Sequence, residues 1–264
     1  MSTTLRRHRA VASGAVATAA CVTLLAACST STTPSGTTGG GTTGVSGTVT
    51  VLAAASLTES FDALKEDFEA ANRGVTVEMS YGSSATLVQQ VNNGAPASVI
   101  ALAGTSAAEP LDSSLVRDKR NFATNVLEIA TPPANPANVT SIDDLARPTV
   151  KVVLCADTVP CGRAAAATFR KARVVPNVVS KEVDVKATLA KVKLGEADAA
   201  VVYRSDVVAA KDAVRGVEIP SPLNTSLDYP VVTLTDDAAA RAFVAYLLSD
   251  RGLATVQAFG FGAP

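Results

Sequence analysis

The chain has 264 residues, with 23 Lys and Arg against 24 Asp and Glu, and 47% of its residues are hydrophobic. This charge balance provides no basic field that would attract nucleic acid, and the hydrophobic fraction is sufficient for the core of one or two globular domains. The sequence contains a single histidine, His8, and no tryptophan.

The N-terminus has the pattern of an exported lipoprotein. Three arginines precede an apolar run over residues 10–27, and Leu-Ala-Ala at 25–27 stands directly before Cys28. These features predict a secretory signal peptide over residues 1–27, with Cys28 as the lipid-bearing first mature residue. A secreted protein without lipid or an uncleaved membrane anchor is the alternative, but the run is near the lower length limit for a spanning helix.

Cleavage at this point would change the chemistry available to the mature protein. It would leave 20 basic against 24 acidic residues and remove His8, so the mature chain would lack the usual general base and the commonest metal ligand. Two cysteines, Cys155 and Cys161, would remain besides Cys28. In an oxidising exterior they most simply form one disulfide, and their spacing differs from the Cys-x-x-Cys pattern of redox pairs.

Residues 28–47 are almost entirely Ser, Thr, Gly and Pro, which predicts a flexible tether. From residue 48 onward, strand and helix patterns alternate. The first part predicts a strand from Val49 leading to Ser56, a helix over 57–71, a strand over 75–81 leading to Ser84, a helix after it, and a short strand over 98–102.

The second part continues in the same way after a partly helical stretch over 104–119. The predicted elements are strands over 126–130, 151–154, 199–203 and 229–234, and helices over 141–145, 163–173, 185–194, 237–248 and 251–259. Alternation of this kind predicts an α/β protein with mixed or parallel sheets.

Four predicted junctions between strands and helices present hydrogen-bond donors without a charge. They are Ser56, Ser84, the turn over 160–162, and the helix start near Val185. Backbone N–H groups at a helix N-terminus lack intrahelical partners, and the helix dipole favours an anion there. A fifth donor is Tyr203, because a buried phenol at the end of an apolar strand needs a partner.

Each of these residues alone is more often a simple helix cap than a binding group. Together they carry more weight, because all of them are predicted to lie beyond the carboxyl ends of strands, where ligands of open α/β sheets bind. Neutral donors can solvate a fully ionised oxyanion, whereas a partly protonated anion such as phosphate would also need an acceptor for its proton.

Several short motifs occur in the order found in a known family. They are Ala-Ala-Ala-Ser-Leu-Thr at 53–58, Gly-Ser-Ser at 82–84, Gly-Ala-Pro-Ala at 94–97, Val-Pro-Cys-Gly at 159–162, Ala-Val-Val-Tyr-Arg-Ser-Asp at 200–206 and Gly-Phe at 260–261. Together they resemble the molybdate-binding proteins of ABC transporters over essentially the whole mature domain. The resemblance implies the two-lobe periplasmic-binding-protein fold of type II, with molybdate or tungstate held in the cleft by hydrogen bonds alone.

The same resemblance implies the lobe boundaries and the ligand set. Lobe I would comprise 48–124 plus 229–264 and lobe II would comprise 125–228, with crossovers near Asn125 and Tyr229. The implied oxyanion ligands are the hydroxyl and amide groups of Ser56 and Ser84, the amides of Cys161 and Val185, and the phenol of Tyr203. Cys161 stands where the family usually has alanine, a tolerable change for an amide contact, and a disulfide to Cys155 would brace the loop.

The implied function is that of a receptor anchored by lipid on Cys28 to the outer face of the cytoplasmic membrane. It would be a monomer that delivers the oxyanion to a permease with a cytoplasmic ATPase, without a cofactor, a cation site or nucleic acid. Three alternatives remain: a binding protein for sulfate, an extracellular enzyme with Ser84 or Cys161 as nucleophile, and a structural or adhesive lipoprotein. The enzyme would lack a histidine base, and the structural protein would show no stabilisation by a ligand.

Overall fold

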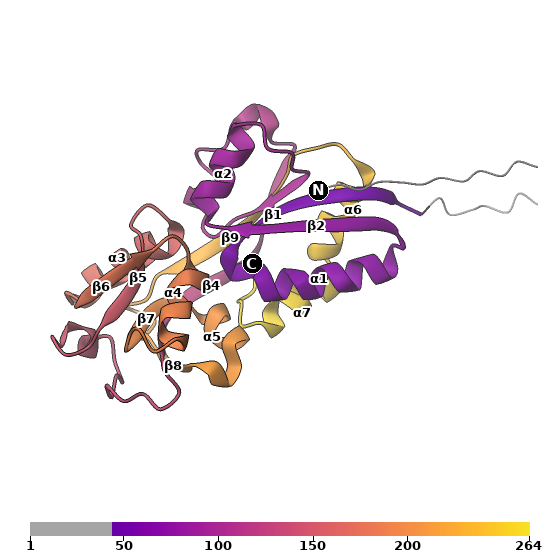
Figure 1. The fold of residues 1–264 in the computed structure, drawn as a ribbon. Helices are drawn as coiled ribbons and strands as arrows, with labels where there is room; N and C mark the ends of the chain where they lie inside the picture. Colours follow the sequence, from indigo (N-terminus) through magenta and orange to yellow (C-terminus); the bar gives the residue numbers. More distant parts are fainter. Residues whose placement is uncertain (1–43) are drawn as a thin grey trace, which may run out of the picture. The chain divides into compact units, whose positions relative to one another are not determined.

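The structure, a computed structural model, describes residues 44–264 (Figure 1). The predicted signal peptide, Cys28 and all but the last residues of the predicted tether lie outside this range. The first strand, β1 (Ser46–Ala54), begins before the expected start of the folded part at residue 48. None of the helices in residues 44–264 combines the length and the apolar composition that a membrane span requires.

Strands and helices alternate through the described residues. The strands are β1, β2 (Gly74–Gly82), β3 (Val99–Ala101), β4 (Asp118–Thr131), β5 (Val152–Cys155), β6 (Val178–Glu182), β7 (Ala199–Tyr203), β8 (Arg215–Glu218) and β9 (Ser226–Thr233). The α-helices are α1 (Thr58–Ala71), α2 (Ser84–Asn92), α3 (Pro160–Ala172), α4 (Val185–Lys193), α5 (Arg204–Ala210), α6 (Ala238–Leu247) and α7 (Asp250–Ala258). A 3-10 turn, η1 (Ala55–Leu57), connects β1 to α1.

The strands pair in the order β2-β1-β3-β9-β4-β7-β5-β6, with β8 added to β4. β1 is parallel to β2 and β3, and β5 is parallel to β6 and β7. The long strand β4 is antiparallel to β9 through residue 126 and antiparallel to β7 from residue 127. Two lobes result (Figure 1): a first lobe with β1–β3, α1, α2, α6 and α7, and a second lobe with β5–β8 and α3–α5, with β4 and β9 running between them.

Apolar side chains of the first lobe cover both faces of its strands. Phe61 and Phe68 of α1 are buried and pack against Phe243 of α6, with ring centroids 6.4 and 5.4 Å apart. On the opposite face, the buried side chains of α2 pack with Leu52 and Ile100. Since full burial of one large apolar side chain contributes roughly 1.5–3 kcal/mol, these two layers hold β1, β2 and β3 in place.

The second lobe is organised around β7, all five residues of which are buried. This strand lies between β4 and β5, and α3 and α4 pack on it, which explains why its sequence is a continuous apolar run without alternation. The strand delivers Tyr203 to its carboxyl end, where α5 begins at the next residue.

Several elements differ from the sequence-based prediction. β4 extends over 118–131, far beyond the predicted 126–130, because its exposed polar first part pairs with β9. α3 begins at Pro160, before the predicted start at residue 163, since a proline suits the first helical position. The strands β6 and β8 and the helix α5 were not predicted, because β6 and β8 are short and have no buried residues and α5 has only seven residues.

Candidate functional site

A cavity of about 20 Å³ lies between the two lobes, where the carboxyl ends of their parallel strands face each other. A space of this size excludes an extended organic ligand and restricts the candidates to small, compact solutes. The lining residues are Ala54, Ala55, Ser56, Gly82, Ser83, Ser84, Ala103, Val159, Pro160, Cys161, Asp184, Val185 and Tyr203. All five residues predicted as ligands therefore line one cavity.

Three of these five residues lie in the first turn of an α-helix. Ser84 and Val185 are the first residues of α2 and α4, and Cys161 is the second residue of α3. The caps leave the amides nearest the cavity free: Ser83 Oγ accepts the N–H of Thr86 at 3.2 Å, and Asp184 Oδ1 accepts the N–H of Ala187 at 2.8 Å. The first amides of these helices thus remain available to a ligand, at the positive ends of the helix dipoles.

Both serine hydroxyls have a hydrogen-bond partner within the described residues. Ser84 Oγ accepts the backbone N–H of Ala103 at 2.9 Å, so its own O–H is directed elsewhere. Ser56 lies in η1, directly after β1, and its Oγ is 3.0 Å from the hydroxyl of Tyr229. Both serine side chains are buried, which favours donation into the cavity over donation to water.

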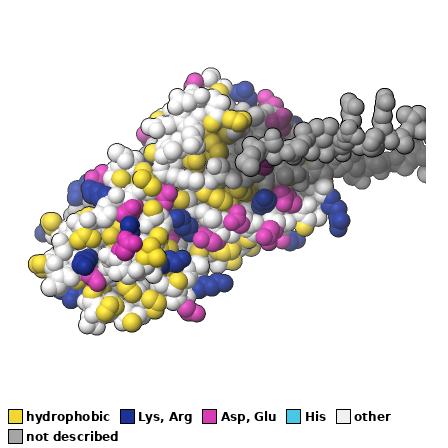
Figure 2. Space-filling model, viewed as in Figure 1, with side chains coloured by type: hydrophobic (Ala, Val, Ile, Leu, Met, Phe, Trp, Pro, Cys, Tyr) yellow, Lys and Arg dark blue, Asp and Glu magenta, His cyan; other side chains and the backbone are white. Residues whose placement is uncertain are grey.

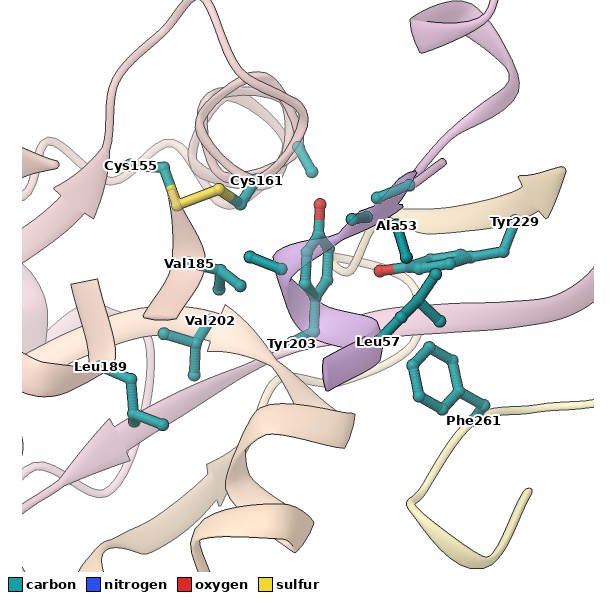
Figure 3. Packing of buried hydrophobic residues seen from close by; sticks show 14 of the residues in the cluster. Ala53, Leu57, Cys155, Cys161, Val185, Leu189, Val202, Tyr203, Tyr229 and Phe261 are labelled. Carbon is teal, nitrogen blue, oxygen red and sulfur yellow. A yellow bond between two sulfur atoms is a disulfide. The ribbon is translucent and has the colours of Figure 1, made fainter. Parts of the chain in front are cut away.

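Tyr203 contributes the most unusual group of the site. Its side chain is 1% exposed, and its hydroxyl has no hydrogen-bond partner among the described residues. Figure 3 shows its ring between the Cys155–Cys161 disulfide and the ring of Tyr229. Burial is the main cause that raises the pKa of this phenol well above its usual value, so it remains a neutral donor.

A disulfide joins Cys155 at the end of β5 to Cys161 in α3, with 5.7 Å between the Cα atoms. It fixes the start of α3 against the strand that precedes it. The next residue, Gly162, is required by this close approach, because a Cβ there would lie 2.0 Å from the carbonyl oxygen of Ala156. In this form neither sulfur is a free thiol that could act as a nucleophile.

Charged side chains lie beside the cavity and neutralise one another. Within residues 44–264, the lining of this cavity includes no Lys or Arg. Close to it, Lys186 Nζ lies 2.6 Å from Glu59 Oε2 and 3.1 Å from Asp206 Oδ1, which joins the two lobes by an ion cluster. On the face seen in Figure 2, Lys and Arg alternate with Asp and Glu, so neither sign forms a continuous patch.

Asp206 connects this ion cluster to the cavity. Its carboxylate is fully buried, and its Oδ2 accepts the backbone N–H of Tyr203 at 3.1 Å. Burial raises the pKa of Asp206 to about 6, while Lys186 opposes that shift. The polar groups that the sequence-based prediction missed are this carboxylate and Tyr229, the partner of Ser56; their local sequences carry no signal for such distant contacts.

Comparison with known proteins places this architecture in a family. The family model described as bacterial extracellular solute-binding protein matches residues 49–262. The chain belongs to this family. The two-lobed α/β fold predicted from the sequence is confirmed, and the small cavity between the lobes is the candidate ligand site of a solute-binding protein.

Individual relatives support the same classification. The solute-binding protein is 35% identical over 222 residues to the molybdate-binding protein ModA of Mycobacterium tuberculosis, covering 82% of this chain and 85% of that relative. The periplasmic molybdate-binding protein of Azotobacter vinelandii has the same fold, with a TM-score of 0.74, 19% identity, and coverage of 82% and 99% of the two chains. The sulfate-binding protein SubI of M. tuberculosis also has this fold, with a TM-score of 0.71, 21% identity, and coverage of 81% and 86%.

Proposed function

We propose that this solute-binding protein captures molybdate or tungstate in the cavity between its lobes. The observation that carries the proposal is the convergence of five neutral donor residues, from both lobes, on one small cavity: Ser56, Ser84, Cys161, Val185 and Tyr203. Two serine hydroxyls, free helix amides and the phenol of Tyr203, which has no partner among residues 44–264, supply donors in several directions, as a tetrahedral oxyanion requires.

The charge state of the ligand follows from the same donors. A dianion without a proton can accept a hydrogen bond at every oxygen, and buried donors at helix N-termini stabilise it without a cationic side chain. Phosphate carries a proton at neutral pH and would need an acceptor. Asp184 lines the cavity and caps α4 through Oδ1, so its Oδ2 is the carboxylate oxygen that a protonated anion could use, and titration with phosphate tests this distinction.

The relatives support molybdate over other anions but leave a second candidate. The M. tuberculosis relative that is 35% identical carries the name molybdate-binding protein. A protein named for sulfate shares the fold, so the fold alone does not discriminate between the two anions. Sulfate has the same charge and shape as molybdate and is smaller, which makes cavity size the discriminating property.

We further propose the cellular arrangement that the sequence implies. Cleavage after residue 27 would leave lipid on Cys28, the stretch to residue 47 would serve as a tether, and the protein would act as a monomer on the outer face of the cytoplasmic membrane. It would pass the oxyanion to a permease with a cytoplasmic ATPase, without a cofactor. For the lobes we propose 48–124 plus 229–264 and 125–228, in accord with the change of partner of β4 after Val126.

Titration calorimetry tests the ligand. Residues 44–264, which form one compact unit, are produced without the lipid and titrated with molybdate, tungstate, sulfate and phosphate at a single pH. The expected result is tight binding of molybdate and tungstate alone. Tight binding of sulfate would transfer the proposal to that anion, and binding of none of the four would contradict it.

A further inference from the structure

Behind Ser56, a chain of buried polar side chains leads away from the cavity. Tyr229 Oη lies 3.0 Å from Ser56 Oγ, and the amide nitrogen of Asn125 lies 3.4 Å from Tyr229 Oη and 2.8 Å from Ser205 Oγ. These four side chains are between 0% and 4% exposed, so water cannot substitute for the partners within the chain.

The direction of each hydrogen bond follows from the amide of Asn125. Its oxygen accepts the N–H of Val126 at 3.0 Å, which fixes the nitrogen as the end facing Tyr229. An amide nitrogen only donates, so the oxygen of Tyr229 accepts that bond, and this favours donation of its O–H to Ser56 Oγ at 3.0 Å. Ser56 Oγ then accepts from Tyr229, and the remaining Ser56 proton is directed away from Tyr229.

The ring of Tyr229 is held in this orientation by edge-to-face contacts on several sides. Its centroid lies 5.2 Å from that of Phe261, 6.1 Å from that of Tyr203 and 6.3 Å from that of Phe122, with interplanar angles of 80°, 78° and 88°. A fully buried ring packed in this way has one position for its hydroxyl. Figure 3 shows Tyr229 beside Tyr203 and Phe261.

We propose that Tyr229 and Asn125 are positioning residues of the anion site, which orient the Ser56 hydroxyl as a donor to the bound oxyanion. The inference rests on the proposed function and deepens it. It also links the site to the connection between the lobes, because Asn125 and Tyr229 lie on β4 and β9 and the amide of Asn125 also holds Ser205 of α5.

The test combines Tyr229→Phe and Ser56→Ala in a double-mutant cycle of molybdate affinity, measured by calorimetry. Tyr229→Phe keeps the packed ring and removes only the hydroxyl, so we expect roughly tenfold weaker binding. In the Ser56→Ala background the same change should have almost no further effect, because Tyr229 acts through Ser56. The matched control is Tyr246→Phe on α6, which removes a phenol hydroxyl outside the site and should leave the affinity unchanged.

Each result decides the inference. Unchanged affinity in Tyr229→Phe, or an equal loss in the native and Ser56→Ala backgrounds, overturns the positioning role while the native protein still binds molybdate. A role limited to stability would lower the free energy of unfolding without coupling to Ser56 in the affinity cycle. If the native protein binds no oxyanion, the proposed function fails and the inference fails with it, which the first titration reveals.

Discussion

The cavity between the lobes and the ion cluster beside it both combine polar groups from the two lobes. The groups of the ion cluster are paired with one another, whereas the cavity has a donor without a partner in the part of the chain that the structure describes. In the ion cluster, the Lys186 ammonium lies within 3.1 Å of both the Glu59 and the Asp206 carboxylates. In the cavity the hydrogen-bond donors are neutral, the Asp184 carboxylate caps α4, and the Tyr203 hydroxyl has no partner among residues 44–264.

The difference has a physical reason. A buried charge without a partner costs several kcal/mol, so the charges must compensate one another before any ligand arrives. A buried neutral hydroxyl without a partner costs only about 1–3 kcal/mol, which a folded protein can tolerate. The neutral donors can therefore remain available for a ligand, while the ion cluster maintains the geometry around them.

The largest expected effect concerns the ion cluster. Lys186→Met should lower the free energy of unfolding by about 3–5 kcal/mol, because it leaves the fully buried Asp206 carboxylate without its cation. Urea unfolding of the protein without ligand measures this loss. The control is Lys191→Met, which removes a more exposed ion pair with Glu196 and should cost less than about 1 kcal/mol. Equal losses in the two variants would mean that the burial of Asp206 does not raise the cost of removing its cation.

The pH dependence of stability tests the burial of the Asp206 carboxylate in the ion cluster. The pKa of Asp206 is about 6 in the folded protein, above the usual 3.8, so the folded state binds the proton more tightly. The resulting stabilisation is complete below pH 3.8 and is lost as the pH rises through about 6, at a cost on the order of 3 kcal/mol. Asp206→Asn should remove this dependence while keeping an acceptor for the N–H of Tyr203. The free energy of unfolding of both proteins is measured between pH 4 and 7. An equal change with pH in the two proteins would show that Asp206 does not cause the dependence.

Tyr203→Phe tests the unpartnered donor of the cavity. Oxyanion affinity should fall by about 1–3 kcal/mol, because a hydrogen bond to a buried charge is lost. The stability of the protein without ligand should remain the same or increase, since the removed hydroxyl has no partner among the described residues. Calorimetry and urea unfolding together separate these effects. A variant that loses stability and keeps its affinity would place Tyr203 outside the ligand set.

Ser84→Ala should behave differently from Tyr203→Phe, although both side chains line the cavity. It should weaken oxyanion binding by about 1–3 kcal/mol and also destabilise the protein without ligand by roughly 1 kcal/mol, because the N–H of Ala103 loses its acceptor. Unfolding measured with and without molybdate distinguishes the two contributions. An unchanged stability without ligand would mean that the bond to Ala103 is replaced or contributes nothing.

The parts of the fold that depend on local patterns could be predicted from the sequence. The continuous apolar run at 199–203 and the helical spacing of Phe61, Leu64 and Phe68 identified β7 and α1, because burial on one or both sides leaves a direct record in the residue pattern. The same holds for the positions of Ser56 and Ser84 at the cavity, since both residues follow predicted strands; their roles as donors remain a prediction.

The contacts that arise only from folding could not be predicted in this way. In the sequence, Tyr229 has the pattern of an ordinary strand residue. Nothing near it predicts its contact with Ser56, which lies 173 positions away. Likewise, Lys186 and Asp206 have the sequence pattern of surface residues on helices. Only the fold places them in contact with each other and with Glu59. Distant polar pairs of this kind depend on topology, which local periodicity does not encode.

The close pair formed by Tyr203 and Tyr229 also has a consequence for spectroscopy. The sequence has no tryptophan and four tyrosines, and two of these four are in contact at the cavity, with ring centroids 6.1 Å apart. Near-ultraviolet absorption, circular dichroism and emission therefore come mainly from tyrosine, with half of these chromophores at or beside the cavity. Occupation of the cavity will be visible in the unlabelled protein as a change in its tyrosine spectrum.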